Sequence, residues 1–99
     1  MRKDETENYF KKNGRIYGLS EKFNFGRWEG YVVVFSDYDD AWEWLETEEH
    51  DFRTRELVTL EEARENLIAY DKQYIEEEID YDEVDYIITN YSTGEDEVI

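Results

Sequence analysis

The sequence has no cysteine and few basic residues. Without cysteine the chain can form neither a disulfide nor a thiolate metal site, so a reducing compartment is its simplest setting. Its 11 Lys and Arg stand against 28 Asp and Glu, which gives a formal net charge of −17 at pH 7. Proteins bind DNA and RNA by neutralising phosphates with Lys and Arg, so this balance argues against direct nucleic-acid binding.

Long apolar runs are missing as well. No run approaches the length of a membrane span, and the first ten residues, MRKDETENYF, lack the apolar core of a signal peptide. The chain nevertheless contains 39% hydrophobic and 17% aromatic residues, too many for a disordered polyelectrolyte. We expect one soluble cytoplasmic domain over residues 1–99, with flexible ends at residues 1–13 and 92–99 and with no membrane partner.

Residues that could carry catalysis are equally scarce. His50 is the single histidine, and it stands in the polar stretch TEEHD with no cysteine to pair with. Asp37 and Asp39 match the first and third positions of an EF-hand calcium loop, but Trp42 occupies the position that requires glycine. We therefore expect no catalytic residue, no metal site and no cofactor, and a protein that is not an enzyme.

Hydrophobic patterning predicts a small α+β domain. The stretch RIYGL (15–19) predicts a short strand, and EKFNFGRWEG (21–30), with its two glycines, predicts a hairpin or bulged connection. YVVVF (31–35) is β-branched and uninterrupted, which indicates a central strand. Ser36 is expected to cap a helix. The predicted buried face of that helix consists of Tyr38, Ala41, Trp42 and Leu45.

The second half of the chain continues the alternation of strand and helix. FRTRELV (52–58) predicts a strand, and Thr59 with Glu62 forms a capping box for a helix that extends to about Ile79. The apolar positions of that helix are Leu60, Ala63, Leu67, Tyr70 and Tyr74. VDYIITNY (84–91) predicts the last strand. The resulting order is β-β-α-β-α-β, a single mostly antiparallel sheet with two helices packed on one face.

The negative charge is concentrated in the last two thirds of the chain. Residues 1–35 contain seven bases and five acids, whereas residues 36–99 contain 23 acids and four bases, a net of −19. The size scaling gives a surface of about 6,000 Å², so 19 charges over half of it leave roughly 160 Å² each. The surface of B-DNA carries one charge per roughly 110 Å². The two densities agree within about a factor of two, which predicts a protein that imitates DNA.

The stretch EEEIDYDEVD (76–85) has the highest density of acids. If the preceding helix extends to Ile79, the three glutamates 76–78 lie in its last turn, where the helix dipole disfavours acids by about 0.3–1 kcal/mol each. Such a cost indicates a basic partner, whereas a helix that ends near Gln73 would leave these acids in a loop. Tyr81, between two acids, is expected to be exposed. The predicted partner-binding residues are Asp37, Asp40, Glu43, Glu46, Glu76, Glu77, Glu78, Asp80, Tyr81, Asp82 and Asp85.

The string IYGLSEKFNFGRWEGY (16–31) resembles the opening of the ArdA-type antirestriction proteins. Those proteins show an Ile-Tyr strand, an aromatic-Asn-x-Gly-x-x-x-Gly turn, and a second strand that leads into an acidic helix. The turn in this chain is Phe23-Asn24-Phe25-Gly26 and closes at Gly30. The resemblance covers about residues 15–47 and implies a small acidic protein of a mobile element that imitates DNA and blocks restriction enzymes. More loosely, the whole chain is similar to the short phage-encoded proteins among which anti-CRISPRs are found.

The leading hypothesis is a phage or mobile-element inhibitor that occupies the basic DNA groove of a defence nuclease in the cytoplasm of the host cell. A CRISPR effector is favoured over a restriction enzyme, because one small domain suits a short groove such as a PAM-reading cleft. Two other interpretations stay open: an acidic antitoxin or immunity protein that neutralises a basic toxic nuclease, and a structural phage protein whose charge prevents aggregation. A homodimer would extend the length of DNA that is imitated, and the sequence leaves the oligomeric state open.

Overall fold

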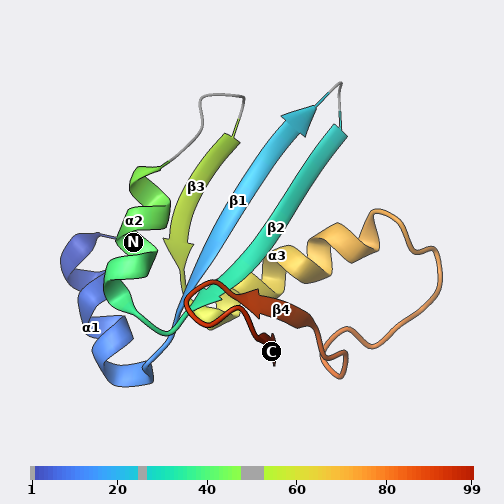
Figure 1. The fold of residues 1–99 in the computed structure, drawn as a ribbon. Helices are drawn as coiled ribbons and strands as arrows, with labels where there is room; N and C mark the ends of the chain where they lie inside the picture. Colours follow the sequence, from blue (N-terminus) through green and yellow to red (C-terminus); the bar gives the residue numbers. More distant parts are fainter. Residues whose placement is uncertain (1, 25–26, 48–52) are drawn as a thin grey trace.

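A computed structural model describes residues 2–24, 27–47 and 53–99, with side chains over 2–21, 30–47 and 54–99 (Figure 1). Its elements are α1 (Lys3–Asn13), β1 (Ile16–Asn24), β2 (Arg27–Phe35), α2 (Tyr38–Glu46), β3 (Arg53–Val58), α3 (Leu60–Lys72), β4 (Ile87–Asn90) and β5 (Asp96–Val98). The predictions that concern Gly26, His50 and Phe52 fall outside the described residues. No helix in the described ranges is long and apolar enough to cross a membrane.

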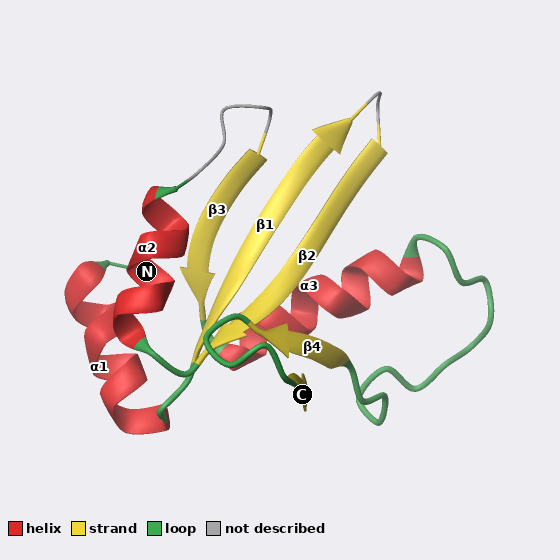
Figure 2. Cartoon of the chain, viewed as in Figure 1, coloured by secondary structure: helices red, strands yellow, loops and turns green. Residues whose placement is uncertain are grey.

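The strands form one five-stranded sheet in the order β3-β1-β2-β4-β5 (Figure 2). Neighbouring strands are antiparallel except for β2 and β4, which pair in parallel through Val33 with Thr89 and Val34 with Asn90. The predicted α+β class and the mostly antiparallel sheet are therefore confirmed. The stretch 31–35 lies in the middle strand of the five, as its uninterrupted apolar run predicts.

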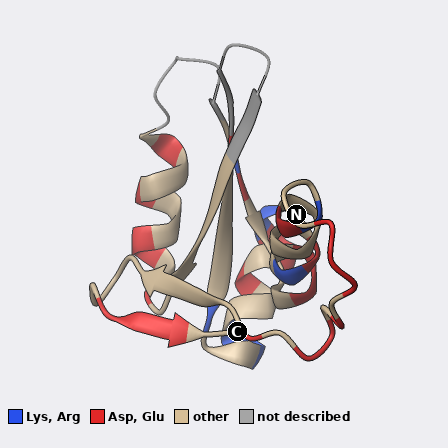
Figure 3. Ribbon diagram, turned by 90° about the vertical axis from the view of Figure 1, so that its right-hand side faces the viewer, with Lys and Arg blue, Asp and Glu red and all other residues tan. Residues whose placement is uncertain are grey.

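The core has two layers, one on each face of the sheet. Successive residues of a strand point to opposite faces, so Ile16 and Phe35 are buried with α2 while Tyr17 and Val34 are buried with α3. Figure 3 shows the two helices on opposite sides of the sheet, seen edge-on. The prediction of two helices on one face is wrong, because the central strands are apolar on both faces and each face requires a cover.

Both stretches for which flexible ends were predicted, residues 1–13 and 92–99, contain a regular element. Residues 3–13 form α1, which ends at Gly14 in the left-handed conformation, with φ 68°. Tyr9 and Phe10 of this helix pack against the core layer of α2. The Leu60 amide also donates a hydrogen bond to the Tyr9 hydroxyl at 2.9 Å. At the other end, residues 96–98 form the edge strand β5.

The helix caps agree with the sequence in one case and differ in the other. The Thr59 side chain accepts a hydrogen bond from the Glu62 amide, as a capping box predicts. Helix α2 is capped by Asp37 and not by Ser36, because the Asp37 carboxylate reaches the Asp39 amide at 2.9 Å. The buried face of α2 also contains a tryptophan that the predicted stripe omitted, Trp44, whose side chain is 3% exposed.

Helix α3 ends at Lys72, about two turns before the predicted end near Ile79. Beyond it the amides of Tyr74 and Ile75 bond to the Asp71 carbonyl in a terminal turn. A helix C-terminus disfavours acids and favours bases. Consistent with this, the last turn contains Lys72 and the helix stops before the glutamates 76–78. The last long strand is also shorter than predicted, since β4 begins at Ile87 and residues 84–86 precede it without strand structure.

Candidate partner-binding surfaces

The predicted acidic residues fall on two separate surfaces. One group lies on α2, and the other lies in residues 76–85, called here the acidic segment, which belongs to the connection between α3 and β4. Figures 1 and 3 both place α2 and this connection on opposite sides of the sheet. The molecule measures 39 × 32 × 25 Å along its principal axes. A flat partner surface therefore cannot contact both groups at once, and the single predicted interface becomes two candidates.

On α2 the four predicted acids have different roles. Asp37 is exposed, but its carboxylate is already engaged with the amides of the first helical turn. Asp40 is half-buried, whereas Glu43 and Glu46 are exposed. The last turn of α2 contains no base, so its negative charges lie beside the negative end of the helix dipole. Of the four predicted acids, two thus have freely exposed carboxylates, one is partly covered and one is engaged in the helix cap.

The acidic segment has no regular secondary structure, but its backbone is bound at several points. The Arg64 guanidinium, on α3, donates hydrogen bonds to the carbonyl oxygens of Tyr81 at 3.1 Å and Val84 at 2.7 Å. The same side chain donates to the Ile99 carbonyl at 2.8 Å, so it joins the segment to the end of the sheet. Within the segment, the Glu83 amide bonds to the Asp80 carbonyl in a turn. These contacts use backbone oxygens and leave most of the carboxylates free.

The carboxylates of the acidic segment point into solvent without a cationic partner. All seven of its acids are exposed: Glu76, Glu77, Glu78, Asp80, Asp82, Glu83 and Asp85. Among the described residues the ion pairs are Arg2–Glu5, Glu7–Lys11 and Arg15–Glu97, and none of them includes a predicted partner-binding acid. One carboxylate, that of Asp80, accepts an internal hydrogen bond from the Asp82 amide. The negative charge of this surface is therefore uncompensated within the described fold.

Tyr81 is less exposed than the sequence predicted. Its side chain is half-buried, and its hydroxyl is buried without a hydrogen-bond partner among the described residues. The Lys72 ammonium lies 5.3 Å from the centre of its ring, a cation–π distance that helps to hold the ring inward. The exposed apolar residues beside the acids are instead Tyr74 (60% exposed), Ile75 and Ile79. They begin directly after α3 ends. Their exposure was not predicted, because the predicted helix extended to about Ile79 and included them.

Two titratable groups near the ends of the sheet have shifted pKa values. The Asn90 amide donates to the Glu97 carboxylate, and with the Arg15 guanidinium at 3.1 Å it lowers the pKa of Glu97. Burial raises the pKa of Tyr86, and the neighbouring Asp71 carboxylate adds to the effect. The first shift follows from the pairing of Glu97 with Asn90 and Arg15, and the second follows from the packing of Tyr86 beside α3.

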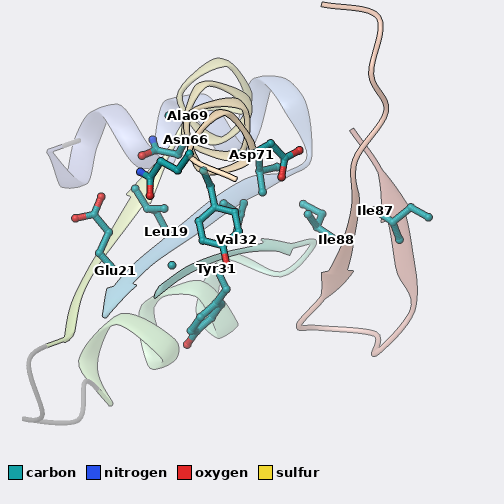
Figure 4. Close-up of a pocket in the computed structure, with 13 residues that line it drawn as sticks. Leu19, Glu21, Tyr31, Val32, Asn66, Ala69, Asp71, Ile87 and Ile88 are labelled. Atoms are coloured by element: carbon teal, nitrogen blue, oxygen red, sulfur yellow. The ribbon is translucent and has the colours of Figure 1, made fainter. Parts of the chain in front are cut away.

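A cleft of about 540 Å³ opens between α3 and the sheet and is called here the α3 cleft (Figure 4). Leu19, Val32 and Ile88 form its floor from three adjacent strands, and Leu67 lies above them on the helix. Sequence reasoning missed this cleft. The apolar stripe of α3 gave the signal, because it continues to Tyr70, whose side chain is 39% exposed.

Within the described ranges, no three His, Cys, Asp or Glu side chains converge closely enough to hold a metal ion.

Comparison of the chain with protein-family models, with curated proteins and with solved structures gave no match.

Proposed function

We propose that this protein binds a basic nucleic-acid-binding protein and occupies its DNA groove as an acidic mimic of DNA. The observation that carries the proposal is the acidic segment, in which seven exposed carboxylates lie on a backbone fixed by Arg64 and form no ion pair in the described fold. Uncompensated charges repel one another and reduce the stability of the folded state. A cationic partner would remove that repulsion on binding, so the uncompensated charge favours the bound state.

Two further features support imitation of DNA over the alternative that the acidic surface serves only solubility. The contacts of Arg64 restrict the segment before binding, so less conformational entropy is lost when a partner binds. On α2, Asp40, Glu43 and Glu46 follow one another at intervals of three residues, which separates their Cβ atoms by about 5–6 Å. That spacing is close to the separation of successive phosphates on one DNA strand.

The surface area of the folded chain changes the charge density that the size scaling gives. The surface of the protein is 7,057 Å², about a sixth larger than the size scaling predicts. Over half of the surface the area per excess charge would stay within about a factor of two of the value for B-DNA, but the acids lie on both sides of the sheet, so the comparison holds only where acids are dense, as in the acidic segment. The comparison therefore supports a groove that is lined with Lys and Arg as the binding partner.

The setting that we propose is a phage or mobile element whose product inhibits a DNA-binding defence nuclease, either a CRISPR effector or a restriction enzyme. One surface of this small domain suits a short cationic groove, such as the one in which arginines read a PAM. We favour a CRISPR effector for this reason.

The test has two stages. The protein is immobilised and used to capture proteins from a host lysate at low salt, with elution by a salt gradient. The DNA affinity of each captured nuclease is then measured with and without saturating amounts of the protein. We expect a nuclease that elutes at raised salt and loses its DNA binding. A nuclease that binds DNA normally while saturated would overturn the mimic. A captured toxin whose toxicity is neutralised would favour the antitoxin alternative, and failure to capture any partner would favour a structural protein.

Matched variants identify which surface is used. The triple variants E76Q/E77Q/E78Q and D40N/E43Q/E46Q each remove three negative charges, the first from the acidic segment and the second from α2. We expect the first to weaken nuclease binding by at least about tenfold and the second by much less, because acids are densest in the acidic segment and all of them are exposed there. Equal losses in the two variants would indicate a response to net charge alone.

A further inference from the structure

The α3 cleft exists because the helix leaves the sheet along its length. Ala63, in the second turn, is fully buried against the sheet, and Leu67 one turn later is only partly buried. Tyr70 is 39% exposed, and Tyr74 beyond the end of the helix is 60% exposed. The apolar floor of the cleft, below the last turns of α3, therefore stays open to solvent at a volume of about 540 Å³.

Among the residues that the structure describes, the charged side chains that line the cleft have one sign. Its titratable carboxylates are those of Glu21 on β1 and Asp71 on α3, which lie on different sides of the opening (Figure 4). No Lys or Arg lines it among the described residues. The glutamates 76–78 follow α3 within a few residues and add further uncompensated charge. An apolar floor with an acidic border is complementary to an apolar group that is flanked by cations.

We infer that the α3 cleft receives an apolar or aromatic side chain from a Lys- and Arg-rich segment of the partner. The choice of a basic partner rests on the proposed function, and the cleft adds an anchor that charge alone does not supply. The volume lies within the range of pockets that enclose small ligands, so a large aromatic side chain fits. Binding energy in interfaces is concentrated in such buried anchors, whereas exposed charges contribute mostly to association rate and selectivity.

The test uses three blocked peptides on the whole protein labelled with ¹⁵N: Lys-Lys-Trp-Lys-Lys, Lys-Lys-Ala-Lys-Lys and Glu-Glu-Trp-Glu-Glu. We expect the first to shift the amide signals of Leu67 and Ile88 and to bind at least about tenfold more tightly than the second, because a buried aromatic is a strong anchor. The third should not bind. Equal affinity for the first two peptides would exclude the anchor, and binding of the third would exclude the requirement for a basic segment.

Variants at Ala69 test the location. Ala69 is exposed on α3 and borders the cleft, so Ala69→Trp fills the opening and Ala69→Arg places a cation there, with little cost to folding. Both variants should bind the peptide Lys-Lys-Trp-Lys-Lys at least about tenfold more weakly than the unmodified protein does. Glu65→Gln, exposed on the same helix but outside the cleft lining, changes the net charge as Ala69→Arg does and should have no effect. Unchanged peptide affinity in both Ala69 variants would overturn the inference.

The same variants separate this inference from the proposed function. If the Ala69 variants bind the nuclease as the unmodified protein does, while E76Q/E77Q/E78Q does not, the cleft plays no part and the mimic stands. A second outcome is that the Ala69 variants no longer bind Lys-Lys-Trp-Lys-Lys, while no captured nuclease loses DNA affinity in the presence of the protein. The cleft is then a binding site, and the proposal of DNA mimicry is wrong.

Discussion

The guanidinium of Arg64 donates a hydrogen bond to the backbone carbonyl of Val84 at 2.7 Å, across 20 residues of sequence. The same group also bonds to Tyr81 and Ile99, and it lies 5.5 Å from the centre of the Tyr86 ring. One side chain on α3 thus fixes the acidic segment, the residue that follows it and the end of the sheet. A lysine presents a single ammonium group and cannot reproduce this planar set of donors.

Replacement of Arg64 should therefore release the acidic segment. We expect Arg64→Ala to lower the free energy of unfolding by about 2–3 kcal/mol and Arg64→Lys to recover only part of it. Hydrogen exchange should accelerate first at the amides of residues 81–86. Exchange rates there that match the unmodified protein would show that other contacts hold the segment.

Asp37 should contribute to the stability of α2 as its cap more than it contributes to partner binding through its charge. Asp37→Ala removes the cap and should cost about 1 kcal/mol in chemical denaturation, whereas Asp37→Asn keeps an effective cap and should cost little. The asparagine variant loses the same charge as the alanine variant. If nuclease binding falls equally in both while only Asp37→Ala is destabilised, Asp37 has a binding role in addition to its cap.

Gly18 is required by close packing on the α2 face of the sheet. A Cβ atom at this position would lie 2.8 Å from Phe35 Cε2 and 2.9 Å from Trp44 Cζ3, both in buried rings. Gly18→Ala should lower the free energy of unfolding by about 1–3 kcal/mol, because neither ring has space to move. Gly30→Ala, whose added Cβ would meet only a backbone oxygen at 3.3 Å, should cost less in the same denaturation experiment.

Glu97 should make stability fall in acid. Its pKa is lowered in the folded protein by the Asn90 amide and by Arg15, so its contribution is present above the unfolded pKa of about 4.3 and is lost as the pH falls through the folded value. Urea denaturation between about pH 5 and pH 3 should therefore show a steeper loss in the unmodified protein than in Glu97→Gln. Glu95→Gln, on the same hairpin, should parallel the unmodified protein.

The acids of the acidic segment should oppose folding while favouring partner binding. Glu77→Lys should raise the thermal midpoint modestly at low salt, because it reduces self-repulsion, and the gain should shrink as salt screens the charges. The same variant should bind the nuclease more weakly. Glu95→Lys carries the same charge change in the turn between β4 and β5, and it should be stabilised without loss of binding. Weak binding in both would indicate a net-charge effect.

The elements predicted best are those determined by residues that are close together in the sequence. The capping box of Thr59 and Glu62 involves residues three apart, and the central strand at 31–35 is identified by its own composition. The same run also contained the evidence for two covered faces, since Val34 and Phe35 are both apolar and point in opposite directions. An alternation of apolar and polar residues would be expected if only one face were buried.

The features that were missed depend on contacts between distant residues. Helix α1 has few apolar residues, and its position is fixed by Tyr9 and Phe10 against the core and by the bond to Leu60. The exposure of Tyr74 and the burial of Tyr81 follow from where α3 ends and from the position of Lys72. The α3 cleft likewise results from the angle between a helix and three strands, which hydrophobic periodicity does not specify.

The parallel pairing of β2 with β4 has a consequence for the order in which the domain assembles. It rests on two residue pairs that join positions more than 50 residues apart, whereas β1 and β2 form a long hairpin from neighbouring sequence. Contacts between distant positions form late and are opened first when the pairing is short. We expect β4 and β5 to detach from the sheet as a unit below the free energy of global unfolding. Such opening would break the bond from Arg64 to Ile99 but would leave its bonds to Tyr81 and Val84, so the acidic segment would keep its shape on α3 while the edge of the sheet behind it opens.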